Sequence, residues 1–309
     1  MNEEILRVSR LCYQCGECTG ACPMRRVSKF SPRSFVYNLL ASSDSDKEEN
    51  TSFNTGEQSK WNCLICDNCY IICPQDVDFP ALILNLRIES EEEETAKAKE
   101  DILAHRIFSE IASFMTHFDK GVPTDFKGET DEESEYGYFT GCLDYLDLFM
   151  DVGVNYHEIG DYAVKLLNEM GIKPRIVSLK CCGHDMLYQG NYNIFEQLAA
   201  YNTEKIKKLG IKKLVVSCAE GFFTFKKYYK LEDAGVEVIH ISQLLSEQME
   251  FSDAEKARNR AITVTYHDPC AMKRFQLYEA PRDAIKTVSY THLRAHETSL
   301  HLVCRLLLE

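Results

Sequence analysis

The chain has 309 residues, 45% of them hydrophobic, and a formal net charge of −13 at pH 7. A globular protein with room for two domains has this length and composition, and no apolar run approaches the roughly 20 residues of a membrane span. The negative charge disfavours a nucleic-acid partner and a DNA-binding regulator, which need basic surfaces, but it suits a basic redox partner. Fourteen cysteines, with no signal peptide at Met1-Asn2-Glu3-Glu4, indicate a reducing cytoplasmic compartment where thiolates bind metals.

Two cysteine runs of one design stand in the first 90 residues. Each reads C-x2-C-x2-C-x3-C followed by proline. Bacterial ferredoxins with two [4Fe–4S] clusters have this spacing, and their fourth cysteine ligates the other cluster. Similarity to them implies two crossed ligand sets: Cys12, Cys15, Cys18 and Cys73 for one cluster, and Cys63, Cys66, Cys69 and Cys22 for the other.

Zinc and disulfides are the alternatives for these runs. A zinc ribbon takes four ligands and needs neither eight cysteines nor the trailing Pro23 and Pro74. A disulfide framework is typical of small secreted chains with a signal peptide. The spacing therefore favours one-electron transfer through two clusters.

Apolar residues at helical spacing predict a helix over Pro32–Ala41 and another over Phe79–Ile88. A longer stripe predicts a helix from Leu103 to Phe118, and the polar segment Asp119–Glu135 is interpreted as a linker. Residues 1–90 are thus expected to form a ferredoxin-type domain, and residues 91–135 a helix and linker.

From Tyr136 the pattern changes to alternating strands and helices. Helices are predicted over Tyr162–Met170 and Tyr192–Leu209, each followed by glycine. Strands are predicted over Tyr136–Thr140, Arg175–Leu179, Lys213–Ser217, Val236–Ile241 and Ile262–Tyr266. The expected fold class is α+β multidomain, a helical two-cluster domain followed by an α/β domain with a mostly parallel sheet.

Four more cysteines follow the predicted strands of this second part. In open parallel sheets ligands bind outside the carboxyl ends of strands, so these thiols are expected at one rim. Buried free cysteines are the alternative, but a Cys-Cys-Gly sequence at one site is hard to explain that way. The candidates are Cys142, Cys181, Cys182 and Cys218.

The pattern resembles the cysteine-rich CCG domain of the heterodisulfide reductase family. Thirty-eight residues separate Cys142 from Cys181, and thirty-five separate Cys182 from Cys218. The amino-terminal run around Cys12 resembles the ferredoxin-like subunit of the same family. The resemblance implies a fusion of two subunits, and a CCG site that can hold a noncubane [4Fe–4S] cluster at which a disulfide is cleaved.

Two departures from the family pattern stand out. Gly221 occupies the place of the last motif cysteine, which leaves four thiols for a possible third cluster, one short of the family's five. A second CCG domain begins at His267–Cys270 but lacks its own Cys-Cys-Gly. Residues 136–255 are therefore expected to form the first CCG domain and 256–287 the start of a second. His267 itself is interpreted as part of a structural turn rather than as an acid–base group.

Residues 288–309 hold three of the nine histidines of the chain. This tail resembles a translated fragment found at the ends of truncated environmental reading frames. His292, His296, His301 and Cys304 are accordingly interpreted as part of a foreign end rather than as a metal site.

Two functions remain open. In the first, the chain is the iron–sulfur subunit of a heterodisulfide reductase-like complex and passes electrons to the CCG site, where a disulfide is reduced. In the second, it is a non-catalytic electron-transfer module for a glycolate, lactate or glycerol-3-phosphate dehydrogenase-type flavoprotein. The expected partners are a flavoprotein, a membrane cytochrome or a second reductase subunit, through which a cytoplasmic chain can associate with a membrane.

Overall fold

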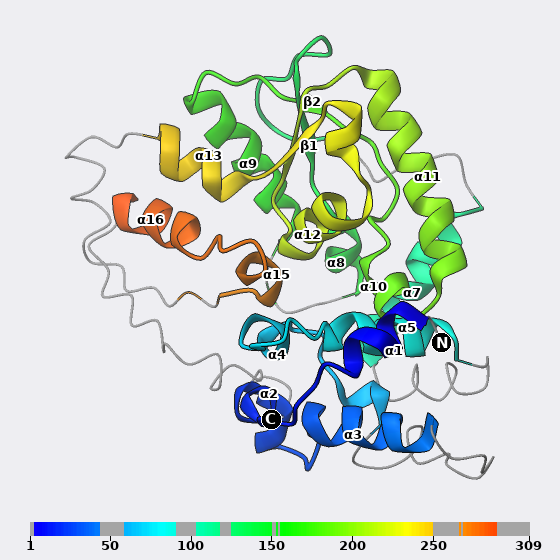
Figure 1. Ribbon diagram of the computed structural model, residues 1–309. Helices are drawn as coiled ribbons and strands as arrows, with labels where there is room; N and C mark the ends of the chain where they lie inside the picture. Colours follow the sequence, from blue (N-terminus) through cyan, green and yellow to red (C-terminus); the bar gives the residue numbers. More distant parts are fainter. Residues whose placement is uncertain are drawn as a thin grey trace. The chain divides into compact units, whose positions relative to one another are not determined.

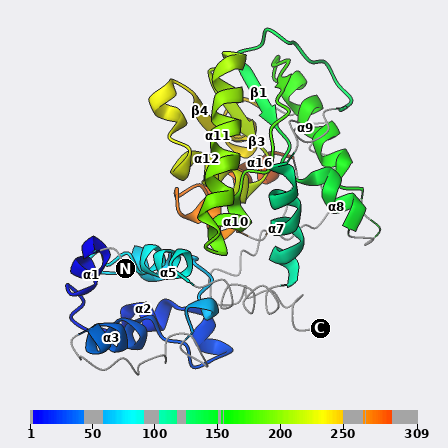
Figure 2. The same ribbon diagram turned by 90° about the vertical axis from the view of Figure 1, so that its right-hand side faces the viewer.

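The chain divides into two compact units (Figures 1 and 2). The first comprises the residues up to Ile107 together with Leu187–Tyr192, and the second comprises Phe108–Met186 and Asn193–Arg294. A computed structural model describes residues 3–43, 59–90, 103–117, 125–149, 153, 155–249, 266 and 268–288. Residues 289–309 of the tail and residues 262–265 of the predicted strand Ile262–Tyr266 lie outside these residues.

Short helices build the first unit, and α2 packs against both α3 and α4. Its core holds Phe30, Phe35 and Phe79, whose ring centroids lie 5.5–6.2 Å apart. The helices are α1 (Glu3–Ser9), α2 (Glu17–Ala21), α3 (Pro32–Ser43), α4 (Asn68–Ile71) and α5 (Phe79–Ile88), with 3₁₀ turns η1 (Pro23–Arg26) and η4 (Lys60–Asn62).

Local sequence fixes the starts of α3 and α5. Ser31 Oγ accepts a hydrogen bond from Ser34 N at 3.3 Å, and Asp78 Oδ1 accepts one from Ala81 N at 2.9 Å. Each helix also has proline in its first turn, where the missing N–H costs nothing. These starts orient the two helices that flank the cysteine loops.

A four-stranded parallel sheet with the order β2-β1-β3-β4 forms the centre of the second unit. The chain leaves β1 toward β2 on one side and returns past it to β3 on the other. The direction of winding therefore reverses between β1 and β3, the place where such sheets bind ligands. The strands are β1 (Tyr136–Phe139), β2 (Arg175–Ile176), β3 (Lys213–Val216) and β4 (Glu237–His240).

Helices cover both faces of this sheet (Figure 1). On one face Tyr138 and Val215 pack with α9 and α13, and on the other Phe139 meets Phe225 of α12 edge to face at 5.3 Å. The helices are α7 (Leu103–Met115), α8 (Leu143–Phe149), α9 (His157–Glu169), α10 (His184–Tyr188), α11 (Tyr192–Leu209), α12 (Ala219–Tyr228), α13 (Ile241–Gln248), α15 (Cys270–Lys273) and α16 (Glu279–Val288), with the 3₁₀ turn η5 (Leu231–Ala234). The start of α7, the end of α10 and the first residue of α11 belong to the first unit.

The predicted fold class is confirmed: a helical unit is followed by an α/β unit with a parallel sheet. The bounds predicted for α5 and α11 are those observed, whereas α9 begins at His157 rather than at Tyr162. The second predicted strand is shorter than expected and ends at Ile176. Among the described residues no helix is both long and apolar enough to cross a membrane.

Candidate iron–sulfur centres

The two cysteine loops of the first unit share one backbone conformation. The second residue after the first cysteine, Gln14 or Ile65, has φ of 64° or 48°. The residue after the second cysteine, Gly16 or Asp67, has φ of 92° or 62°. A β-branched residue such as Ile65 is rarely found at positive φ, and such strain is typical of functional sites. The repeated geometry wraps each loop inward before α2 or α4 begins.

Thiols of both runs gather at two cavities in the first unit. The first cavity is lined by Cys12, Cys15, Cys18 and Cys73, together with Cys69. The second is lined by Cys22, Cys63, Cys66 and Cys69. In each, three cysteines of one loop meet the fourth cysteine of the other run, which is the arrangement that the ferredoxin resemblance implies.

Burial and mutual repulsion disfavour ionisation of these thiols in the protein alone. Burial raises the pKa of Cys63 to about 11 despite the nearby Arg87, and burial and neighbouring thiolates raise that of Cys69 further. Backbone donors face two of the sulfurs, because Ile65 N lies 3.4 Å from Cys63 Sγ and Val77 N lies 3.4 Å from Cys73 Sγ. A set of thiolates with N–H donors fits a positively charged iron–sulfur core, whose charge offsets their repulsion.

The cysteines of the second unit gather at the switch point of the sheet. Cys142 follows β1 and Cys218 follows β3, the two strands between which the winding reverses. Their loops touch, since a Cβ added to Gly141 would lie 3.3 Å from Cys218 Cβ. Gly141 has φ of 82°, which lets the first loop turn toward the second.

Cys181 and Cys182 complete this group of four thiols. Both are buried, with 2% and 7% of their surface exposed. The side chains of Cys142 and Cys182 hydrogen-bond to Cys181, and these bonds lower the pKa of Cys181 while they raise that of Cys142. Gly183 N also donates to Cys181 Sγ at 3.4 Å. The structure thus brings all four predicted thiols together.

A buried amide that was not predicted from the sequence supports the Cys-Cys segment. Asn202 of α11 is fully buried, and its Nδ2 donates to the carbonyls of Lys180 and Cys181 at 3.2 and 3.1 Å. Its Oδ1 accepts from Lys180 N at 2.8 Å. Tyr229 donates its hydroxyl to the Cys182 carbonyl at 2.9 Å. The sequence gives no sign that Asn202 and Tyr229 hold the backbone of the cysteine pair, because each is a single polar residue on or just after a helix.

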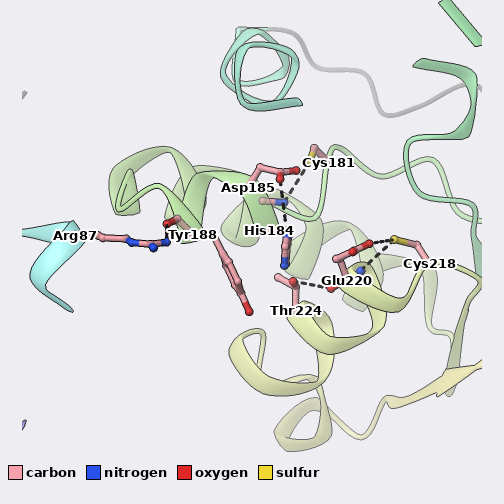
Figure 3. Close-up of polar contacts among 10 residues, drawn as sticks. Arg87, Cys181, His184, Asp185, Tyr188, Cys218, Glu220 and Thr224 are labelled. Atoms are coloured by element: carbon pink, nitrogen blue, oxygen red, sulfur yellow. Dashed lines mark hydrogen bonds and ion pairs between the residues drawn. The ribbon is translucent and has the colours of Figure 1, made fainter. Parts of the chain in front are cut away.

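Polar side chains lie near two of these thiols, Cys181 and Cys218 (Figure 3). Cys218 Sγ lies 3.4 Å from Glu220 Oε2, and burial followed by the charge of Glu220 raises the pKa of Cys218. His184 Nδ1 lies 3.7 Å from Asp185 Oδ1 at the start of α10. The carboxylate of exposed Glu220 thus stands beside a thiol.

The remaining predicted positions lie elsewhere. Gly221 is the third residue of α12, and its N–H lies 3.4 Å from Cys218 Sγ. Cys270 is exposed at the start of α15. His267 and the histidines of the tail lie outside the described residues.

Comparison with known protein families gives two matches. Residues 9–77 match the 4Fe-4S dicluster domain, and residues 136–226 match the cysteine-rich CCG domain. The first match spans all eight cysteines that line the two cavities of the first unit, and the second spans the four thiols at the switch point. Iron–sulfur clusters are therefore the cofactors of the chain.

Several curated proteins of methanogens are similar to the chain. An uncharacterized iron–sulfur protein of Methanococcus maripaludis is 27% identical over 90% of this chain and 55% of its own length. One of the subunits of the fumarate reductase (CoM/CoB) of Methanothermobacter marburgensis is 26% identical over 86% of this chain and 52% of its own length. One of the subunits of the dihydromethanophenazine:CoB–CoM heterodisulfide reductase of Methanosarcina mazei is 24% identical over 88% and 71%.

The chain spans about half the length of the first two of these relatives. No solved structure matches it.

Proposed function

We propose that this chain, a heterodisulfide reductase-like iron–sulfur protein, passes electrons through two [4Fe–4S] clusters to the CCG cysteines within an oxidoreductase complex. More generally, it is an iron–sulfur electron-transfer protein related to subunits of heterodisulfide and fumarate reductases. Its relatives are subunits of such reductases, which supports the presence of redox partner subunits.

The observation that carries the proposal is the crossed pairing of thiols at the two cavities of the first unit. Cys73 joins the first loop and Cys22 joins the second, so each cavity offers four thiols to a cubane cluster. When bound, the clusters supply one-electron carriers. The protein holds them close to each other, because Pro32, Cys69 and Phe79 line both cavities. Phe79 is buried, and it adds an apolar side chain to the lining of both.

At the switch point, Cys142, Cys181, Cys182 and Cys218 provide four thiols, enough for a third cluster. The Asn202 amide and the Tyr229 hydroxyl hold the backbone of the adjacent pair in a fixed position. The carboxylate of Glu220 stands 3.4 Å from Cys218 Sγ, where it can take or return a proton when a disulfide is reduced.

Anaerobic purification tests the proposal. Iron and acid-labile sulfide should be present in nearly equal amounts, and reduction should give the electron paramagnetic resonance (EPR) signals of two [4Fe–4S] clusters. Cys22→Ser should alter the same signal as Cys66→Ser, and Cys73→Ser the same signal as Cys15→Ser. Cys270→Ser is the matched control and should leave both signals unchanged. A chain without sulfide would contradict the electron-transfer function. If Cys22→Ser altered the same signal as Cys15→Ser, only the crossed ligation would be contradicted.

One observation favours a second candidate function, that of an electron-transfer module without chemistry at the CCG site. Gly221 stands where the family pattern has a fifth thiol. In that case a flavoprotein, a membrane cytochrome or a second reductase subunit carries the substrate site, and the chain is bound to the membrane only through such a partner. Addition of an oxidised disulfide to the reduced protein separates the two. A thiol-bound radical signal in EPR favours the first function, and reoxidation without that signal favours the second.

A further inference from the structure

Arg87 in α5 is a buried cation in the first unit, with 4% of its surface exposed. Its guanidinium donates to carbonyl oxygens of three residues. Nη2 donates to Lys60 O at 2.9 Å and to Cys63 O at 2.6 Å, and Nη1 donates to Tyr188 O at 2.9 Å (Figure 3). The guanidinium also lies 5.0 Å from the ring centroid of Trp61. Carbonyl dipoles and a ring face orient the cation but carry no net negative charge.

A buried cation of this kind needs a negative charge to offset its loss of hydration. The second cavity lies beside this cation, because Arg87 Nη2 bonds the carbonyl of Cys63, whose thiol lines that cavity. Arginine keeps its proton in proteins, so the guanidinium is charged at neutral pH.

The first cavity differs in this respect. The Arg33 guanidinium lies at that loop, where a Cβ added to Gly16 would be 3.5 Å from Arg33 Nη1. Arg33 is exposed, however, and so is Cys15 of the same loop. Water and salt screen charges at such a surface far more than charges in the interior. The fixed positive field therefore acts mainly on the second cavity.

We infer that Arg87 raises the midpoint potential of the cluster held by the Cys63 loop above that of the cluster held by the Cys12 loop. This inference rests on the proposed electron-transfer function. Four thiolates and a [4Fe–4S] core carry a net charge that becomes one unit more negative on reduction. A buried cation stabilises the more negative state, because net charge, hydrogen bonding and exposure set the potential of a cluster. The Cys63 cluster is then where an electron rests within the first unit.

The test is potentiometry of the full-length, cluster-loaded chain, with both EPR signals followed together. Arg87→Met should shift the reduction equilibrium of the Cys63 cluster at least tenfold toward the oxidised form, which is about 59 mV for one electron. The other cluster should shift several times less. Arg87→Lys keeps the charge without the planar fork, and it should shift the potential less than Arg87→Met. The signal that Cys66→Ser alters identifies the Cys63 cluster.

Lys60→Met is the matched control, because Lys60 is also a buried basic residue. It begins the 3₁₀ turn η4, and Arg87 bonds its backbone carbonyl. This variant should shift the Cys63 cluster less than Arg87→Met does. Asp67→Asn gives the opposite test, since the Asp67 carboxylate is buried and directly follows Cys66, which lines the second cavity. It should raise the potential, and it keeps the inference testable if Arg87→Met fails to fold.

The inference would be overturned if Arg87→Met shifted neither cluster or shifted both equally. It would also be overturned if Lys60→Met shifted the Cys63 cluster as much as Arg87→Met does, or if Asp67→Asn lowered its potential. These outcomes presuppose that the wild-type chain assembles both clusters. A wild-type chain without clusters would instead contradict the proposed function, so the two failures are distinguishable.

Discussion

At Gly221 the backbone has room for a small side chain. An added Cβ would lie 3.8 Å from Cys218 Sγ and 3.3 Å from Val216 Cγ1, so the valine must move by only a few tenths of an ångström. Gly221→Cys and Gly221→Ala should therefore both change the free energy of unfolding by less than about 1 kcal/mol, with the helix propensity gain offsetting the contact. Gly221→Cys alone should raise the iron and sulfide content of the CCG site, because it supplies a fifth thiol.

Gly221→Ala is the control for backbone effects in α12. The measurement is iron and sulfide per chain in a Cys12→Ser, Cys63→Ser background, in which the first unit holds less iron. Equal content in both variants would show that the missing thiol does not limit the CCG site.

Asn202 is the residue whose loss should most disturb the Cys-Cys segment. Asn202→Leu leaves Lys180 N–H and the carbonyls of Lys180 and Cys181 buried without this partner, at a cost of about 3 kcal/mol in unfolding free energy. Tyr229→Phe removes one hydroxyl that bonds the Cys182 carbonyl and keeps the ring, so it should cost about 1 kcal/mol. Urea unfolding measures both losses.

The alkylation rate of Cys181 and Cys182 in the folded, cluster-free chain reports whether the segment has moved. Asn168→Leu is the matched control, since Asn168 holds Glu129 and Ile172 backbone groups away from the cysteines. It should lower stability without a change in alkylation. The same change in alkylation from both variants would mean that only global stability matters.

Among the helices, α13 depends on a neutral histidine at its start. His240 Nδ1 accepts from Ser242 N at 3.3 Å, and Gln243 Oε1 accepts from His240 N at 2.9 Å. Burial lowers the pKa of His240 to about 4, so the imidazole is neutral in the fold at neutral pH. A lowered folded-state pKa contributes stability that is fully present above the unfolded value of about 6.5 and is lost as the pH falls toward 4.

Between pH 6.5 and 4 the second unit should thus lose stability on the order of 3 kcal/mol through this group. Hydrogen exchange of peptides from β4 and α13, corrected for intrinsic rates, measures the loss. His240→Asn keeps an acceptor at the helix start, so its stability at pH 8 should be similar and its pH dependence in this range weaker. An unchanged pH profile in His240→Asn would assign the acid sensitivity to other groups.

Local sequence determines some elements well and others poorly. The bounds of α5 and α11 were predictable, because proline and an N-terminal aspartate begin α5 and Gly210 ends α11. The start of α9 was missed because a distant side chain stabilises it: Asp147 accepts from Tyr156 N at 2.6 Å and His157 N at 2.7 Å. The second strand is short because the chain turns after Val177, where Leu179 N donates to Val177 O.

For the molecule as a whole, cysteine spacing predicted which thiols gather, whereas their supporting residues depend on tertiary contacts. Repeated spacing indicates two cavities because covalent reach and proline limit the loops. Arg87 and Asn202 gave no such signal, since each is a single polar residue on a helix. The backbone groups that Arg87 bonds lie at least 24 residues away in sequence, and those that Asn202 bonds lie at least 21 residues away. Contacts of this range are fixed only when the whole chain folds.

The two units should also differ in their dependence on iron. The first unit has short helices around two cavities lined by thiols, and a small unit of this kind gains much of its stability from the bound metal. The second unit has a parallel sheet covered on both faces by buried side chains such as Tyr138, Phe139 and Val215. Anaerobic removal of iron by a chelator should therefore unfold the first unit and leave the sheet folded.

Hydrogen exchange resolved by peptide distinguishes the two units. After iron removal, α2, α4 and α5 should lose protection by at least tenfold, while β1, β3 and β4 should change by less than threefold. Cys270→Ser, outside both cavities of the first unit, should respond as the wild type does. Equal loss of protection in both units would mean that the clusters stabilise the whole chain. Protection kept in α2 and α4 would mean that those helices need no metal to remain folded, and that the aromatic core around Phe79 is enough to stabilise them.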